Sequence, residues 1–282
     1  MKPIRLMAGF FTVSIWTLLS RVMGFVRDIL IASFLGTGPV AEAFLVAFSL
    51  PNLFRRFFAE GAFNMAFVPM FSKKVEGGDD PATFAQDAFV GMAGLLIVFT
   101  AIGIVAMPAL VAAMASGFMA DERFDLAVTY GRIAFPYILF ISLSALLSGV
   151  LNATGRFVAA AAAHVLLNVI FILALVGTAI FGTPDNLNIG QSLAWAVPVA
   201  GVAQLALVFI AARRAGFPMK LKMPKLTPDL KKLALIAAPA ALAGGVVQIN
   251  LLVGRQVASF FDGAVAWLNY ADRLYQLPLG VV

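Results

Sequence analysis

Long apolar stretches, separated by short groups of glycine, proline or charged residues, run through the whole chain of 282 residues. A stretch of about 20 apolar residues is long enough to cross a bilayer as a helix. The pattern predicts eight membrane-spanning helices, at residues 6–34, 39–72, 84–116, 126–152, 157–182, 190–213, 229–261 and 263–282. Several exceed the length that a crossing needs, which indicates tilt, projecting ends or kinks at Pro51, Pro136 and Pro239.

The composition agrees with an all-α, polytopic membrane protein. Hydrophobic residues make up 62% and charged residues only 12% of the chain, against about 25% charged residues in a soluble domain. The basic N-terminus and the apolar run after it resemble a signal peptide, but the run is too long and lacks a cleavage site, so we expect a retained first helix. The chain has no cysteine and one histidine, and no ligand cluster is apparent, so we predict no metal and no cofactor.

Basic residues are distributed unequally between alternate loops. With a cytoplasmic N-terminus, twelve of the 20 Lys and Arg residues lie on the cytoplasmic side and only Arg123 and Arg132 lie outside. The positive-inside rule therefore places the N-terminus in the cytoplasm. The net charge of +6 is thus explained by the membrane rather than by nucleic acid. The basic, proline-rich segment 214–228 is expected to lie along the anionic inner surface.

A weak internal repeat predicts two lobes. The sequence ASFL at 32–35 returns as ASFF at 258–261, and Leu-Pro follows both copies at 50–51 and 277–278. Duplicated transporters show parallel repeats of this kind. We therefore expect a six-helix lobe at 1–213, a linker at 214–228 and the first two helices of a second lobe at 229–282. Because the chain stops within an apolar run, we expect this second lobe to be incomplete.

Six arginines are counted with neither side of the membrane because they lie within the predicted spans: Arg21, Arg27, Arg55, Arg56, Arg255 and Arg273. A charge at the centre of a span costs about 2.5–3.5 kcal/mol on insertion scales. Arg21, Arg55 and Arg273 lie roughly 22, 24 and 15 Å from the starts of their spans, so all three can reach mid-membrane depth. Each could be neutralised locally by one of five acids: Asp28, Glu42, Glu60, Asp262 and Asp272. The surplus of guanidinium nevertheless predicts an anionic ligand, and the planar fork suits phosphate in particular.

The first span carries three of these charges in the segment SRVMGFVRD at 20–28. At 100° per residue, Arg21, Gly24 and Asp28 fall on one side of the helix, whereas Arg27 points about 120° away. We expect Arg21 to contact the ligand, because the missing side chain of Gly24 leaves room for a headgroup.

Other polar residues have ordinary structural explanations. His164 lies in an apolar stretch and is expected to pack against, or hydrogen-bond to, a neighbouring helix. Asp79 and Asp80 follow two glycines and are expected in a solvated turn.

Four segments closely resemble one family along the whole chain: SRVMGFVRD at 20–28, PNLFRRFFAEGAF at 51–63, FPYIL at 135–139 and YADRL at 270–274. This is the MurJ (MviN) family of lipid II flippases in bacterial peptidoglycan synthesis, within the multidrug/oligosaccharidyl-lipid/polysaccharide exporter superfamily. The resemblance implies a fourteen-helix fold with two six-helix lobes around a cationic cavity and two further helices. Only the first lobe and the start of the second would be present here.

The resemblance also implies a set of site residues. The essential cavity arginines of the family match Arg21, Arg27, Arg55 and Arg273. The family's acid on the second helix matches Glu42, and the first-helix motif supplies Ser20, Gly24 and Asp28 as supporting residues. Arg255 matches no family arginine. Span seven has no acid before Asp262, so a coupling-cation site in the second lobe is not supported.

The function implied by the resemblance is lipid II translocation across the bacterial cytoplasmic membrane by alternating access, without enzymatic chemistry. The expected partners are lipid II, membrane lipids and the cell-wall synthesis machinery. In this mechanism the arginines grip the pyrophosphate, and Glu42 or Asp28 competes for them in the empty carrier. The alternatives are a flippase for another polyprenyl-linked glycan, a drug or cation antiporter, which would favour cavity acids, and an enzyme acting on polyprenyl phosphates, which would need a constellation of acids or histidine.

Overall fold

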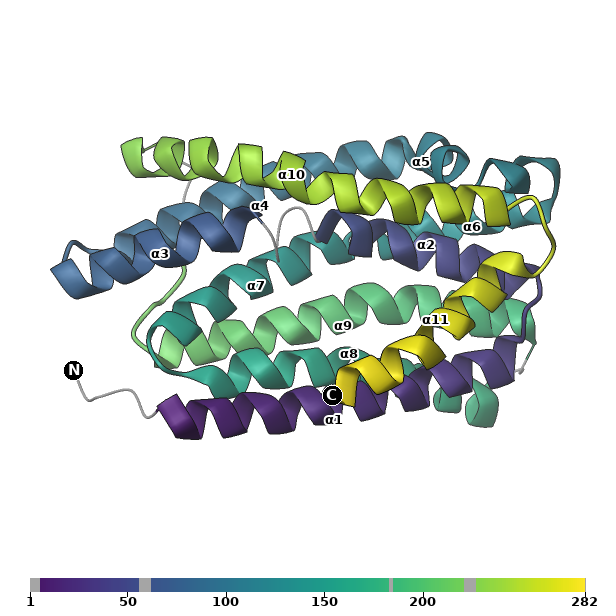
Figure 1. Cartoon of the computed structure of the whole chain (residues 1–282), viewed down its shortest axis with the longest axis horizontal. Helices are drawn as coiled ribbons and strands as arrows, with labels where there is room; N and C mark the ends of the chain where they lie inside the picture. Colours follow the sequence, from purple (N-terminus) through teal and green to yellow (C-terminus); the bar gives the residue numbers. More distant parts are fainter. Residues whose placement is uncertain (1–5, 56–61, 183–184, 221–226, 282) are drawn as a thin grey trace.

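A computed structural model describes residues 6–55, 62–182, 185–220 and 227–281, and these residues form helices and connecting turns (Figure 1). The all-α class is confirmed. The helices are α1 Leu6–Leu35, α2 Pro39–Arg55, α3 Ala62–Gly77, α4 Pro81–Val105, α5 Met107–Met114, the 3-10 helix η2 Ser116–Ala120, α6 Glu122–Ala134, α7 Tyr137–Ala153, α8 Phe157–Phe181, α9 Asn186–Arg214, α10 Pro228–Ala258 and α11 Ala264–Val281.

Each predicted span coincides with one helix or with two consecutive helices. The fourth span is divided at Phe135 and Pro136 into α6 and α7, which confirms the predicted kink there. The third span is divided at Ala106 into α4 and α5. Pro51 and Pro239, in contrast, lie inside the continuous helices α2 and α10. Within the described residues, α4, α6 with α7, α8 and α9 are long and apolar enough to cross a membrane.

Helix α2 forms the centre of the bundle. Its residues 40–47 are all buried, and it contacts α6, α7 and α9. Phe48 of α2 lies 5.8 Å from the Phe44 ring and 5.3 Å from the Phe171 ring of α8. Figure 1 shows most helices running lengthwise, while α11 (yellow) crosses obliquely and contacts both α2 and α1. Through this crossing, the last helix reaches the charged part of the first.

The start of the predicted linker is fixed on helices α3 and α4. The Gln86 side chain on α4 pairs with both the backbone N–H and the backbone carbonyl of Lys220. Phe217 packs edge-on against Phe71 of α3 at 5.6 Å. Lys74 of α3 forms an ion pair with Asp229 of α10 at 2.9 Å. Residues 221–226 lie outside the described residues, so the position of the linker on the membrane surface stays a prediction.

Two minor predictions have different outcomes. Asp79 and Asp80 lie in the turn between α3 and α4, and the Asp80 carboxylate accepts the Thr83 N–H at 3.2 Å, which confirms the turn. His164 is exposed, and its Nδ1 lies 3.2 Å from the Ala160 carbonyl of its own helix. This polar contact is made within its own helix α8, so the structure does not bear out the expected hydrogen bond to a neighbouring helix.

Gly190 permits the close approach of α9 to α2 and α6, and it provides a test of this packing. A Cβ at Gly190 would lie 2.5 Å from Val40 Cγ1 and 2.7 Å from the Tyr130 hydroxyl. We expect Gly190→Leu to cost about 1–3 kcal/mol of stability through overpacking. Thermal unfolding of the purified protein in detergent would measure this loss. Gly177→Leu is the matched control, because a Cβ at Gly177 meets nothing within 4 Å. Equal unfolding temperatures for the two variants would contradict the packing described here.

Candidate functional site

The charged segment of α1 presents two polar faces to different parts of the bundle. Ser20, Gly24 and Arg27 face α8, where all three meet the Asn168 side chain. Arg21 and Asp28 are seven residues apart and therefore lie within about 20° of one another on a second face. Asp28 turns towards α11, because it contacts Arg273. The two faces therefore have different partners.

Asn168 is the common partner on the α8 side. Its Oδ1 accepts a hydrogen bond from Arg27 Nη1 at 2.9 Å, and its Nδ2 donates to the Ser20 carbonyl at 2.9 Å. A Cβ at Gly24 would lie 3.6 Å from Asn168 Nδ2. A side chain at Gly24 would therefore lie against the Asn168 amide, and the expected room for a headgroup beside Gly24 stays a prediction. Gly24 lies about 60° from both Arg21 and Arg27 on the helical wheel, so helical geometry alone does not assign it to either face.

Arg27 is buried between α1 and α8. Its Nε and Nη2 donate to Asp28 Oδ1 at 2.9 and 2.7 Å, which confirms the predicted local pairing. Its guanidinium carbon also lies 5.6 Å from the centre of the Phe171 ring. Only 8% of the Arg27 side chain is exposed. Arg27 thus holds the Asp28 carboxylate rather than facing an open space.

Asp28 links the first helix to the last. Its Oδ1 takes both contacts from Arg27, and its Oδ2 lies 3.1 Å from Arg273 Nε on α11. The exposed fractions of the side chains are 16% for Asp28 and 39% for Arg273, so this pair is partly accessible. The structure therefore joins Asp28 and Arg273 of the predicted site directly.

The other two predicted arginines, Arg21 and Arg55, lie on α1 and α2. Arg21 is exposed, about 10 Å along α1 from Asp28 and on the same face. Arg55 is half buried at the end of α2. Arg255 is half buried in the last turn of α10. Arg56 and Glu60 lie outside the described residues. A joint grip of Arg21, Arg55 and Arg273 on one ligand stays a prediction.

Glu42 lies in a different ionic cluster, near the other ends of α2 and α11. It is 1% exposed, accepts a hydrogen bond from Arg123 Nη1 at 2.9 Å, and accepts the Val265 backbone N–H at 3.0 Å. Arg123 also contacts Asp121 at 2.6 Å and the fully exposed Asp262 at 3.4 Å. Its hydrogen bonds to Asp121 lower the pKa of that carboxyl below its usual value. Glu42 therefore joins α2, α6 and the start of α11.

Further contacts close this end of the bundle. The Ser116 N–H donates to Gln256 Oε1 at 3.0 Å, and the Gly117 N–H donates to Ser259 Oγ at 3.0 Å. The Tyr270 hydroxyl donates to the Gly36 carbonyl at 2.7 Å. In each case one partner belongs to residues 1–213 and the other to α10, α11 or the turn between them. With a cytoplasmic N-terminus this end would face the outside.

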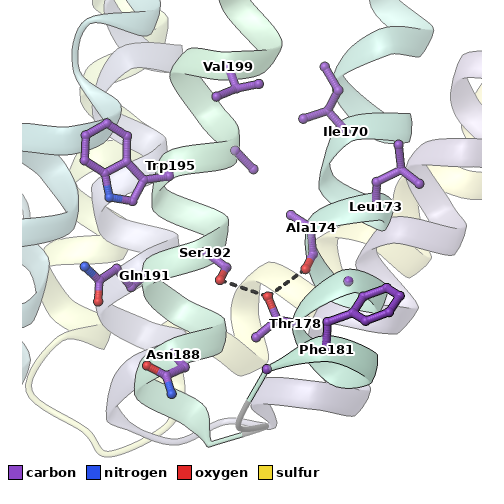
Figure 2. A pocket seen from close by; sticks show the side chains of 13 residues that line it. Ile170, Leu173, Ala174, Thr178, Phe181, Asn188, Gln191, Ser192, Trp195 and Val199 are labelled. Atoms are coloured by element: carbon purple, nitrogen blue, oxygen red, sulfur yellow. Dashed lines mark hydrogen bonds between the residues drawn. The ribbon is translucent and has the colours of Figure 1, made fainter.

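A groove of about 910 Å³ lies away from these charges, between α8 and α9 (Figure 2). Figure 2 shows the Thr178 hydroxyl between the Ala174 carbonyl and the Ser192 hydroxyl, with Trp195 and Phe181 at the margins. None of the predicted site residues lines it. Among the described residues, no group of three or more histidines and acids is placed to hold a metal ion.

Sequence reasoning missed two important partners. Asn168 is a buried amide within the apolar helix α8, and a polar side chain in such a span is itself a signal of a contact. Arg123 was assigned to an outer loop for the charge count, but only 6% of its side chain is exposed. Its signal is weaker, because neighbouring acids such as Asp121 and Glu122 are also typical of a solvated helix start.

Comparisons with known proteins agree on one family. The family model described as "Lipid II flippase MurJ" matches residues 31–282. The probable lipid II flippase MurJ of Rhizobium tropici is 49% identical over 98% of this chain and 52% of its own length. The lipid II flippase MurJ of Burkholderia cenocepacia is 42% identical over 96% of this chain and 53% of its own. The chain thus spans about half the length of the curated relatives it matches.

Solved structures agree with the fold. A lipid II flippase MurJ in an inward closed conformation matches with a TM-score of 0.76 and 25% identity, over 95% of this chain and 55% of that one. An outward-facing multidrug transporter of the MATE family, in the MOP superfamily, matches with a TM-score of 0.66 at 16% identity, over 96% and 61% of the two chains. The second likeness concerns the fold alone.

The buried contact between Glu42 and Arg123 can be tested by stability. Glu42→Gln keeps the shape and one acceptor but removes the charge opposite Arg123, so we expect a loss of about 1–3 kcal/mol. Thermal unfolding in detergent would measure it. Glu122→Gln is the matched control, because Glu122 is exposed one residue from Arg123. A Glu42→Gln variant as stable as this control would mean that the buried ion pair does not hold this end together.

Proposed function

The chain belongs to the lipid II flippase MurJ family, and we propose that it moves lipid II from the inner to the outer leaflet by alternating access. Members of this family are multi-pass proteins of the bacterial inner membrane and act in transport. For this chain we propose a cytoplasmic N-terminus, from the positive-inside distribution of its loops. The proposed ligand is the polyprenyl pyrophosphate headgroup, with the polyprenyl tail remaining in the lipid.

The contact between Asp28 and Arg273 is the observation that carries this proposal. A carboxylate of α1 pairs with a guanidinium of α11, so an anion holds together the first helix and a helix of the predicted second lobe. A pyrophosphate carries the same sign of charge and more acceptor oxygens. We infer that it replaces Asp28 at Arg273 when the headgroup enters. The partial exposure of this pair supports the exchange, because a ligand can reach it.

The arginines then have different roles. Arg21 is exposed on the Asp28 face, and Arg273 is partly exposed, so these two are the best candidates for direct contact with phosphate. Arg27 is buried under Asp28 and Asn168, and its role is to orient the carboxylate. Arg55 lies on α2, and its part in the grip rests on the match to the family's cavity arginines.

The cluster around Glu42 supports the alternating-access part of the proposal. It closes one end of the bundle through contacts between residues 1–213 and helices α10 and α11. In an outward-facing state these contacts have to break, so that the headgroup can leave. Alternating access of this type moves one bundle against the other around a fixed site.

The rival functions fit these contacts less well. A cation antiporter needs a carboxylate that is available to the cation, whereas Asp28 and Glu42 are both paired with arginines. An enzyme acting on polyprenyl phosphates would need acids or a histidine arranged for proton transfer, whereas Asp28 and Glu42 are engaged by arginines. A flippase for another polyprenyl-linked glycan would use the same pyrophosphate contacts, so it has to be separated by experiment.

The fork geometry of the arginines can be tested by lysine substitution. Arg21→Lys and Arg273→Lys keep the charge but lose the bidentate contact, so we expect the flipping rate to fall about tenfold or more. Cells depleted of their own flippase would express each variant, and the fraction of lipid II left in the inner leaflet would be measured. Arg213→Lys, on an exposed site at the cytoplasmic end of α9, is the control. Normal flipping with alanine at both Arg21 and Arg273 would contradict the proposed site.

The choice of glycan can be tested with the purified protein in vesicles. We expect transfer of lipid II, and little transfer of a polyprenyl pyrophosphate that carries an unrelated oligosaccharide. The measurement is the rate at which each lipid becomes accessible to a reagent confined to the opposite side. Faster transfer of the unrelated glycan lipid would favour the alternative carrier.

A further inference from the structure

Asn168 is a buried polar side chain in the middle of a helix that is otherwise strongly apolar. It is 5% exposed, and every polar atom of its amide is used: Oδ1 accepts from Arg27, and Nδ2 donates to the Ser20 carbonyl, with the Ser20 hydroxyl at 3.4 Å. A buried amide in an apolar span costs free energy unless it is satisfied in this way. The hydrogen bonds described here are all made with α1.

These contacts fix the rotation of α1. Ser20 and Arg27 are seven residues apart, so the Asn168 amide holds α1 at two points along roughly 10 Å of the helix. Gly24 lies between them, close enough that the two helices meet without an intervening side chain. With this face held against α8, the other polar face, with Arg21 and Asp28, is directed away from α8.

The same amide begins a chain of contacts that ends on α11. Asn168 Oδ1 accepts a hydrogen bond from Arg27, and Arg27 donates to Asp28 Oδ1. Asp28 Oδ2 in turn forms an ion pair with Arg273. Donors and acceptors alternate along this chain, so the orientation of each group depends on its neighbour. The Asn168 amide itself touches neither Arg21 nor Arg273.

We propose that Asn168 is a positioning residue for the anion site: it sets the rotation of α1 and orients Arg27, so that Arg21 and Asp28 face the ligand. The inference rests on the proposed function and adds a residue of α8 to the site. The Asn168→Ala variant therefore impairs the site without removing any group that touches the ligand.

The rotation of α1 can be measured directly, because the chain contains no cysteine. A single cysteine is placed either at Arg21 or at Val22. Val22 is also exposed, and it lies about 140° from Arg27 on the helical wheel, away from the contact with α8. In lipid vesicles, a charged thiol reagent is expected to label Cys at position 21 at least fivefold faster than at 22. Asn168→Ala is expected to bring this ratio close to one, because it releases α1 from its angular restraint.

Gln204→Ala is the matched control. Gln204 on α9 is another buried amide of the same lobe; it accepts from the Tyr137 hydroxyl at 3.2 Å and donates to the Ala163 carbonyl at 2.9 Å. Its loss removes comparable interhelical hydrogen bonds without touching α1. We expect Gln204→Ala to lower the unfolding temperature about as much as Asn168→Ala, but to leave the labelling ratio and lipid II flipping near wild type.

The outcomes separate this inference from the proposed function. A high labelling ratio that Asn168→Ala leaves unchanged would overturn the positioning role alone, as would equal loss of flipping in Asn168→Ala and Gln204→Ala. A ratio near one in the otherwise unchanged chain would contradict the water-accessible site itself. A ratio that collapses only in Asn168→Ala, together with about tenfold slower flipping, is the result expected.

Discussion

The pairing of Asp28 with two arginines is the interaction on which the rest of the site depends. A charge within an apolar bundle is tolerated only when it is paired and hydrogen-bonded. Asp28 meets this requirement for Arg27 on its own helix and for Arg273 on α11, using a different oxygen for each. Because the two oxygens have separate partners, the link to α11 can break while Arg27 keeps its counter-charge. An arriving anion can then take the vacated place at Arg273.

The sequence predicted the helices better than the contacts between them. Hydropathy locates each span because burial in lipid demands about 20 apolar residues, and the surplus of arginine indicates an anion. Helical periodicity gives the angle between Arg21 and Arg27, but it cannot say which helix each face meets. Asn168 is 141 positions from Arg27, and Arg123 is 81 positions from Glu42. Such partners become neighbours only through the packing of the bundle.

The family motif and the structure give different information about Glu42: the motif suggests a role, and the structure gives its contacts. The resemblance placed Glu42 with the cavity residues, and the structure places its carboxylate between Arg123 and the first turn of α11. Positive charge from Arg123 and from the helix N-terminus converges on it. A carboxylate held in this way is suited to locking helices together, and the lock involves the same α11 that carries Arg273.

The two carboxylates therefore differ in how easily their contacts can be exchanged. The pair of Glu42 and Arg123 has exposed fractions of 2% and 6%, whereas Asp28 and Arg273 have 16% and 39%. A ligand shifts a conformational equilibrium only by its difference in affinity for the two states. On the proposed mechanism, the headgroup first replaces Asp28, because this pair is more exposed than the pair of Glu42 and Arg123. The free energy of that binding is then available to move α11, and the buried contacts of Glu42 set the barrier to opening the other end.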